Sequence, residues 1–272
     1  INSVRIPYVV DNAVEVLKSF DTIIVIGARR PVAFFAYPNK PGILTQDSTK
    51  FVELASLSDD ITDLIEKLSD KIGVSNKVPS TMSKLKIPEI PKGPINTTSL
   101  GMVLGALIPE NAIVVDESVT TGREFFNQTA GSCPHTWLNN CGGSIGFGMP
   151  VAIGAATACP DQKVIALEGD GSAMYTVQSL WTMARENLDI VVLIFANQSY
   201  KILQGELTNV GVTNPGKSAL EMLSLKDPSL DWVSVSKGMG VDGVRVDNIE
   251  DLVKNFKHGL KENGPFLIEV MI

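Results

Sequence analysis

The chain contains few of the residues that build metal clusters and disulfide frameworks. It has three cysteines and two histidines among its 272 residues. Cys133, Cys141 and Cys159 are odd in number, and their spacings of 8 and 18 positions match no zinc or redox motif. His135 and His258 lie far apart with no matching ligand cluster. We therefore expect unpaired thiols in a reducing cytoplasm and no His/Cys metal site.

Long apolar runs and an excess of positive charge are also missing. The longest apolar runs are about seven residues, far short of the roughly 20 that span a bilayer. Acidic residues outnumber basic ones by 30 to 23, a net charge of −7, which argues against nucleic acid and anionic membrane partners. The chain begins Ile1-Asn-Ser-Val-Arg, with neither an initiator Met nor a basic-then-apolar signal pattern, so we expect a processed, cut or partial chain.

Three common nucleotide and hydrolase motifs are absent. The apolar run ending at Gly27 is followed by Ala-Arg-Arg-Pro, not by Gly-x-Gly-x-x-Gly, so a dinucleotide fingerprint is missing. No Gly-x4-Gly-Lys-Ser/Thr phosphate loop occurs. Gly142-Gly-Ser-Ile-Gly has the wrong spacing for a nucleophile elbow.

What the sequence does contain is Gly169-Asp170-Gly171, followed 27 positions later by Asn197. Each end of this motif follows an apolar, β-branched run, Lys163–Glu168 and Ile190–Ala196, and the segment between them is predicted to be one helix. A carboxylate and a carboxamide then stand at the carboxyl ends of two strands, where open parallel sheets bind ligands. Two hard oxygen donors beside a helix N-terminus suit Mg²⁺ carrying a diphosphate, which glycines without a Cβ can approach closely.

The pattern of the chain predicts two unequal parts joined by a linker. Residues 1–73 alternate helix and strand signals, residues 74–95 are Pro-rich and read as an extended linker, and residues 96–272 repeat βα units. Strands are expected at Thr22–Ile26, 42–45, 112–115, Lys163–Glu168, Ile190–Ala196, Gly243–Val246 and Phe266–Val270. Helices are expected at Asn12–Phe20, Asp59–Ile72, 98–108, from about 121, Val151–Ala158 and 248–263, and residues 203–230 are a poorly periodic excursion. The fold class is therefore α/β, with a doubly wound, mostly parallel sheet.

Residues 138–200 resemble the cofactor-binding region of thiamine diphosphate-dependent enzymes, whose signature is Gly-Asp-Gly followed by Asn. The branch that it resembles holds benzoylformate decarboxylase and the acetolactate synthase large subunit. The resemblance implies thiamine diphosphate and Mg as cofactors. It also implies that residues 96–272 are a whole diphosphate-binding domain and that residues 1–73 are the C-terminal half of a central α/β domain.

The resemblance assigns roles to individual residues. Asp170 and Asn197 match the side-chain ligands of Mg²⁺, and Ser199 matches a backbone carbonyl ligand. Ile145 matches the apolar side chain that bends the cofactor between its two rings, which brings an internal base to the reacting carbon. Residues matching other cofactor contacts are Val119, Thr120, Gly143, Ile145, Gly169, Gly171, Ser172 and Tyr200, with Val119 restricted to backbone contact. Ile202, Leu203 and Glu206 match a place where relatives line the substrate pocket, whereas Trp181 and Met183 are expected in the core.

The resemblance also implies that part of the enzyme lies outside this chain. The family's activating glutamate belongs to a pyrimidine-binding domain, and no residue here can take its role. We expect that N-terminal domain, or a separate chain, as a partner in a homo- or hetero-oligomer, and we expect this chain alone to be inactive. The implied reaction is decarboxylation or carboligation of a small 2-oxo acid, with both left open. The alternatives are a non-catalytic thiamine diphosphate-binding or regulatory subunit and a 2-oxoacid oxidoreductase-type subunit.

Overall fold

The computed structural model describes residues 3–272. The chain divides into two compact units, Ile1–Ser83 and Lys84–Ile272, so the division falls inside the predicted linker. Within residues 74–95 the structure has no helix or strand, apart from a single bridge between Pro94 and Asn248. The identity of residues 1–73 as half of a larger domain stays a prediction.

The first unit is built on a two-stranded parallel sheet. Its elements are α1 (Val10–Leu17), β1 (Thr22–Ile26), β2 (Lys50–Ala55) and α2 (Ile61–Lys71), with Thr22 paired to Lys50. The strand expected at 42–45 is wrong, because Ile43 makes only a single bridge to Val32 and the second strand lies at β2. Ile24 and Ile26 on β1 are exposed.

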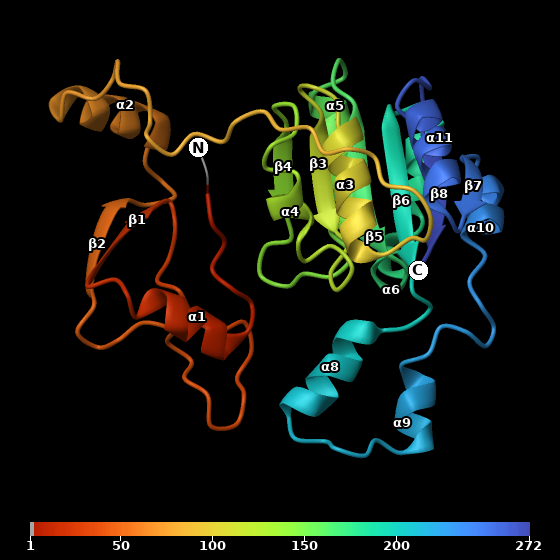
Figure 1. The fold of residues 1–272 in the computed structure, drawn as a ribbon, viewed down its shortest axis with the longest axis horizontal. Helices are drawn as coiled ribbons and strands as arrows, with labels where there is room; N and C mark the ends of the chain where they lie inside the picture. The colour runs from red at the N-terminus through yellow and green to blue at the C-terminus, as the bar shows by residue number, and fades with distance from the viewer. Residues whose placement is uncertain (1–2) are drawn as a thin grey trace. The chain divides into compact units, whose positions relative to one another are not determined.

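The second unit is a six-stranded sheet in the order β4-β3-β5-β6-β8-β7 (Figure 1). Its strands are β3 (Ile113–Glu117), β4 (Thr136–Asn139), β5 (Val164–Gly169), β6 (Ile190–Ala196), β7 (Asp242–Val246) and β8 (Phe266–Met271). All five pairings are parallel, which confirms the predicted fold class. β6 is buried at all seven positions, as its continuous apolar sequence predicts for a central parallel strand.

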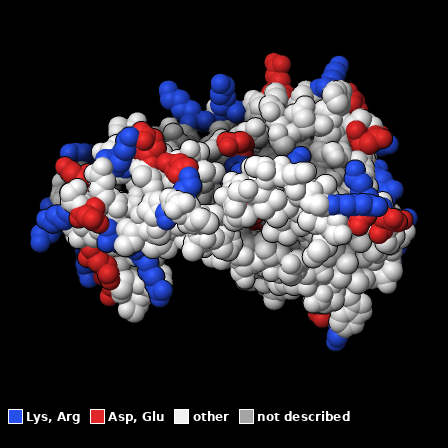
Figure 2. Space-filling model, turned by 90° about the horizontal axis from the view of Figure 1, so that it is seen from below, with Lys and Arg blue, Asp and Glu red and all other residues white. Residues whose placement is uncertain are grey.

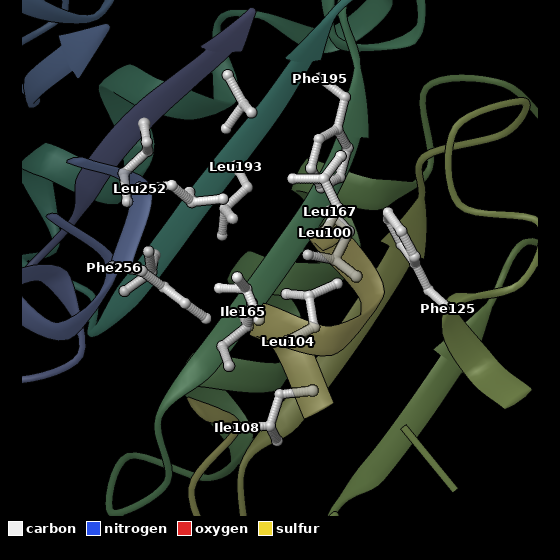
Figure 3. Close-up of a cluster of buried hydrophobic side chains, with 14 of the residues drawn as sticks. Leu100, Leu104, Ile108, Phe125, Ile165, Leu167, Leu193, Phe195, Leu252 and Phe256 are labelled. Atoms are coloured by element: carbon white, nitrogen blue, oxygen red, sulfur yellow. The ribbon is translucent and has the colours of Figure 1, made fainter. Parts of the chain in front are cut away.

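Helices cover both faces of this sheet. The helices of this unit are α3 (Thr97–Leu107), α4 (Phe125–Gln128), α5 (Gly148–Ala158), α6 (Asp170–Ala173), α7 (Ser179–Arg185), α8 (Lys201–Asn209), α9 (Lys217–Met222), α10 (Trp232–Gly238) and α11 (Ile249–Gly259). Of these, α8 and α9 lie below the sheet in Figure 1 and contribute no buried residue. One apolar cluster joins the sheet to α3, α4 and α11, and Figure 3 shows its side chains meeting between these helices and the strands. A second cluster joins the opposite face to α5, α7 and α10.

The single helix expected between Gly171 and Asn197 is wrong. The segment forms α6, a 3-10 turn (Met174–Thr176) and α7. Gly, Ser and β-branched residues have low helix propensity. At the break, the Thr176 hydroxyl donates to the carbonyl of Gly146 at 3.1 Å. Met183 is buried as expected, but Trp181 is half exposed and lies against Arg185.

Within residues 3–272, no helix has the length and apolar character needed to cross a membrane.

Candidate functional site

The sequence motif lies where the connections of the sheet reverse direction. β3 is followed by β4 on one side of it, whereas β5, on its other side, is followed by β6. The carboxyl ends of β3 and β5 therefore border a crevice, the usual ligand position in open α/β sheets. In Figure 1, α6 and α8 leave the sheet at this same lower edge. The predicted residues after β3, β5 and β6 all stand there.

Asp170 and the turn after β6 are joined by a direct hydrogen bond. Oδ2 of Asp170 accepts from the backbone N–H of Gln198 at 2.6 Å, and Oδ1 accepts from the N–H of Gly171 at 2.9 Å. Asn197 Oδ1 accepts from the N–H of Ser199 at 3.0 Å and from its hydroxyl at 3.2 Å. The structure thus brings the two ends of the motif together in one hydrogen-bonded turn.

Strain in this turn is held by neighbouring backbone. Gln198 has a φ of 55°, in the left-handed region that non-glycine residues seldom adopt. Its carbonyl accepts from the N–H of Leu225 at 2.9 Å, and the N–H of Tyr200 donates to Leu223 at the same distance. Such strained residues persist where surrounding contacts fix them, and they cluster at ligand sites.

The Asp170 carboxyl is buried and its pKa is raised. It is 3% exposed, and burial raises its pKa to about 6, against the lowering effect of the Gln198 and Gly171 N–H donors. The described residues contain no group of three His, Cys, Asp or Glu side chains that could hold a metal. A carboxylate with one carboxamide oxygen fits Mg²⁺, which keeps few protein ligands and takes other oxygens from phosphate and water.

Gly169, Gly171, Ser172 and Tyr200 surround the start of α6. A Cβ on Gly171 would lie 2.7 Å from two ring carbons of Tyr200, so the ring packs directly against that glycine. A Cβ on Gly169 would meet nothing closer than the Ser172 hydroxyl, at 3.5 Å. The four predicted positions are therefore neighbours, and only Gly171 is required by close packing.

A cavity of about 640 Å³ lies beside this turn. It is lined by the predicted residues Thr120, Asn197 and Ser199. Lining residues that the sequence did not reveal include Thr121, Gln198, Lys201, Gln204 and Lys226. The two lysine ammonium groups give the cavity a positive contribution suited to an anion.

Val119 occupies the turn between β3 and Thr120 with a φ of 48°. This conformation is a genuine outlier for a β-branched residue. It orients the backbone of the turn, the only part of Val119 predicted to contact a ligand.

The predicted substrate residues Ile202, Leu203 and Glu206 are not brought to the cavity. They belong to α8, which has no buried residue, and the same helix presents Lys201 and Gln204 to the cavity instead. Their assignment stays a prediction.

Gly143 and Ile145 lie on a separate loop, residues 140–147, which follows β4 and is not part of the cavity lining. Ile145 is 40% exposed, so it is not a core residue. Gly143 has a φ of 69°, and Gly142 and Gly146 are also left-handed. The loop is therefore built for an irregular path that presents Ile145 to its surroundings.

Glu117, the last residue of β3, was missed by the sequence reading and organises this loop. Its carboxylate accepts from the N–H groups of Gly146 at 2.7 Å, Phe147 at 3.4 Å and Gly148 at 2.8 Å. Asn140 Nδ2 donates to it at 3.4 Å and to the Ser144 carbonyl at 3.0 Å. The only sequence signal was a run of two acids, Asp116-Glu117, at the end of an apolar strand.

Glu168, on β5, is paired in register with Glu117, on the neighbouring strand β3. It is fully buried, and burial raises its pKa well above its ordinary value, with the nearby Glu117 raising it further. Neutral Glu168 avoids placing two negative charges at this point of the sheet.

Comparisons with known proteins agree with this geometry. The family described as "Thiamine pyrophosphate enzyme, C-terminal TPP binding domain" matches residues 122–270. IlvX of Mycobacterium tuberculosis, which carries the name of the acetolactate synthase large subunit, is 40% identical over 98% of this chain and 52% of its own length. Benzoylformate decarboxylase of Pseudomonas aeruginosa is 28% identical over 97% of this chain and 51% of its own.

A solved structure shows the same likeness. The thiamine diphosphate-dependent 4-hydroxybenzoylformate decarboxylase of Rhodococcus jostii RHA1 matches with a TM-score of 0.74 and 26% identity, over 98% of this chain and 51% of that one. The chain thus spans about half the length of the relatives it matches.

Proposed function

The chain belongs to the thiamine pyrophosphate enzymes, and from that premise we propose that it is the diphosphate-binding half of an enzyme acting on 2-oxo acids. The reaction is decarboxylation, carboligation or both, of the kind its relatives' names describe. The observation that carries the proposal is the Asp170–Gln198 hydrogen bond, which places Asp170 and Asn197 together at the crevice.

These residues would hold thiamine diphosphate through Mg²⁺. Asp170 and Asn197 supply side-chain oxygens, Ser199 supplies its backbone carbonyl, and the diphosphate supplies further oxygens. Thr120, Gly169, Gly171, Ser172 and Tyr200 would contact the diphosphate, with Val119 contributing backbone only. The N–H groups at the start of α6 face the same edge of the sheet, and Lys201 and Lys226 add positive charge.

When bound, thiamine diphosphate supplies a thiazolium electron sink for breaking a bond beside a 2-oxo group. The protein's contribution is position and electrostatics. Gly143 and Ile145 would support the pyrimidine side, with the exposed Ile145 side chain wedged between the two rings of the cofactor. Ile202, Leu203 and Glu206 on α8 would border the substrate rather than the diphosphate.

A partner domain or chain would complete the site in an oligomer. The chain covers about half of its relatives, and apolar side chains are exposed beside the site: Ile145 is 40%, Met174 40% and Tyr175 63% exposed. Figure 2, seen from below, shows few charged side chains over the middle of residues 84–272. Such a surface suits burial against a pyrimidine-binding domain better than open water. The unpaired Cys133, Cys141 and Cys159 fit the reducing cytoplasm.

The test is performed on the protein purified together with whatever polypeptide accompanies it. Carbon dioxide release from pyruvate and benzoylformate is measured with Mg²⁺ and thiamine diphosphate, for the wild type, for Asp170→Asn, and for a control, Asp161→Asn, at an exposed position. We expect release by the wild type and the control only. Cofactor binding without release from any 2-oxo acid would favour the regulatory subunit, and no binding would contradict the proposal.

A further inference from the structure

We propose that Glu117 is a positioning residue that fixes the loop 140–147 for the pyrimidine side of the cofactor. The inference rests on the proposed function and adds a residue that the sequence motif does not contain. Glu117 is not among the residues that line the cavity of about 640 Å³. It would act through the loop that carries Gly143 and Ile145.

Glu117 forms hydrogen bonds with the backbone at the end of this loop. Oε1 accepts from the N–H groups of Gly146 and Phe147, and Oε2 accepts from the N–H of Gly148, the first residue of α5. Glu117 is 2% exposed, so these hydrogen bonds are shielded from water. Charge-assisted hydrogen bonds are stronger than neutral ones, and a carboxylate at a helix N-terminus is further stabilised by the helix dipole.

The backbone of the loop is rich in glycine. Three of its glycines, Gly142, Gly143 and Gly146, adopt left-handed φ values of 70°, 69° and 90°. Glycine loses more conformational freedom on ordering than other residues, so a glycine-rich loop needs external contacts to keep one path. Other hydrogen bonds of the loop run from Asn140 to Ser144, from Cys141 to Asn139, from Val151 to Phe147 and from Thr176 to Gly146.

Gly148 packs closely against the side chains of Glu117 and Glu168. A Cβ on Gly148 would lie 2.1 Å from Oε1 of Glu168 and 3.0 Å from the Cβ of Glu117. Glu168 is followed directly by Gly169 and Asp170. The paired strands β3 and β5 therefore set the loop at a fixed place beside the diphosphate side of the site.

The two sides of the ligand can be separated experimentally, because inorganic diphosphate has no pyrimidine ring. Dissociation constants of Mg–thiamine diphosphate and of Mg–inorganic diphosphate are measured by calorimetry on the chain as purified. The variants are Glu117→Gln, which removes the charge and turns a donor toward the loop, and Glu117→Asp, which keeps the charge with a shorter reach. Glu110→Gln, in the exposed turn before β3, is the control.

We expect Glu117→Gln to weaken thiamine diphosphate binding by about tenfold or more, and inorganic diphosphate binding by less than about twofold. Glu117→Asp should fall between Glu117→Gln and the wild type, and the control should match the wild type. A merely structural role would weaken both ligands together. Equal weakening of both, or unchanged thiamine diphosphate affinity, would overturn the inference.

Amide hydrogen exchange without ligand gives a second readout that does not depend on cofactor binding. The N–H groups of Gly146 and Gly148 should exchange at least about tenfold faster in Glu117→Gln than in the wild type, while β6 stays protected. Unchanged exchange would overturn the inference even if binding changed. A wild type that binds neither ligand would contradict the proposed function, whereas the exchange result would still decide whether Glu117 holds the loop.

Discussion

The backbone N–H of Gln198 donates to Oδ2 of Asp170 at 2.6 Å, across 28 positions of the sequence. This bond joins the turn after β5 to the turn after β6, so a ligand bound to either turn is influenced by the other. The bond lowers the pKa of Asp170, whereas burial raises it by more, to about 6. The metal-binding chemistry proposed for this edge therefore depends on the contact that positions Asp170 and on the burial that raises its pKa.

Binding of Mg²⁺ at Asp170 should depend on pH near 6. The folded-state pKa of Asp170 lies above its ordinary value of 3.8, because burial disfavours the charged form. A cation binds the deprotonated carboxylate, so Mg²⁺ affinity should be constant above pH 7 and fall about tenfold per pH unit below about pH 6. Calorimetric titrations of Mg²⁺ with thiamine diphosphate at pH 5, 6, 7 and 8 measure this; equal affinity at pH 5 and 8 would contradict it.

Ionisation of Glu168 should lower the stability of the protein. Its folded-state pKa is raised well above 4.5, so its contribution to stability is fully present below pH 4.5 and is lost as pH rises through the raised pKa. Glu168→Gln keeps the shape and cannot ionise, so its free energy of unfolding should exceed that of the wild type at pH 9. Urea unfolding at pH 5, 7 and 9 tests this. Parallel pH curves for the two proteins would show that Glu168 does not titrate as described.

Gly171→Ala and Gly169→Ala should differ sharply in their effect on the free energy of unfolding. The added methyl at Gly171 would meet the Tyr200 ring at 2.7 Å, so the ring or the start of α6 must move. We expect Gly171→Ala to lower the free energy of unfolding by about 1–3 kcal/mol, as overpacking does elsewhere. Gly169→Ala, with its nearest neighbour at 3.5 Å and an ordinary φ of −78°, should cost less than about 1 kcal/mol. Chemical denaturation of both variants gives the comparison, and equal losses would refute the packing argument.

Ile145→Ala should affect ligand binding without affecting stability. The side chain is 40% exposed, so its truncation leaves no sealed cavity, and the unfolding free energy should change by less than about 0.5 kcal/mol. Its proposed contact is with the rings of thiamine diphosphate, so affinity for that ligand should fall while affinity for inorganic diphosphate stays. Leu220→Ala, 47% exposed on α9, is the matched control. A fall in stability with unchanged affinity would assign Ile145 to packing instead.

Lys163→Met should lower the stability of the protein without affecting ligand binding. Lys163 pairs with Asp189 and donates to the carbonyls of Glu262 at 2.7 Å and Gly259 at 3.2 Å, at the end of α11. The ammonium is at the start of β5, at the sheet edge opposite the site. Its removal should cost about 1–3 kcal/mol of stability because the largely buried ammonium loses its ion pair and two carbonyl acceptors lose their donor, with ligand affinity unchanged. Lys217→Met, whose side chain is 89% exposed, should cost less than about 0.5 kcal/mol.

The sequence predicted those parts of the fold whose signal is local and repeated. The run Ile190–Ala196 is the strand β6 with the same bounds, and Asp170 and Asn197 stand at strand ends as expected. β4 was missed because Thr136–Asn139 is only four residues long and half exposed, so it has no long apolar run. The segment from Gly171 to Asn197 looked continuous because the contact between Thr176 and Gly146 that accompanies its break is tertiary.

In the candidate site, too, the sequence predicts what is local and misses what depends on tertiary contacts. The Gly-Asp-Gly motif could be read because its residue types and spacing carry the chemistry directly. Glu117 could not, because its role depends on the register of β3 against β5 and on a loop 29–31 positions later in the chain. Lys201 was adjacent to predicted residues, but only the orientation of α8 shows that it lines the cavity.

The most direct test of the account is a calorimetric titration of thiamine diphosphate into this chain, with Mg²⁺ and then with EDTA. Asp170→Asn is titrated in parallel, with Asp161→Asn as its control. The account predicts one binding event that requires Mg²⁺, is lost in Asp170→Asn and is kept in Asp161→Asn. Binding that persists in EDTA, or that is equal in Asp170→Asn and the wild type, would contradict it.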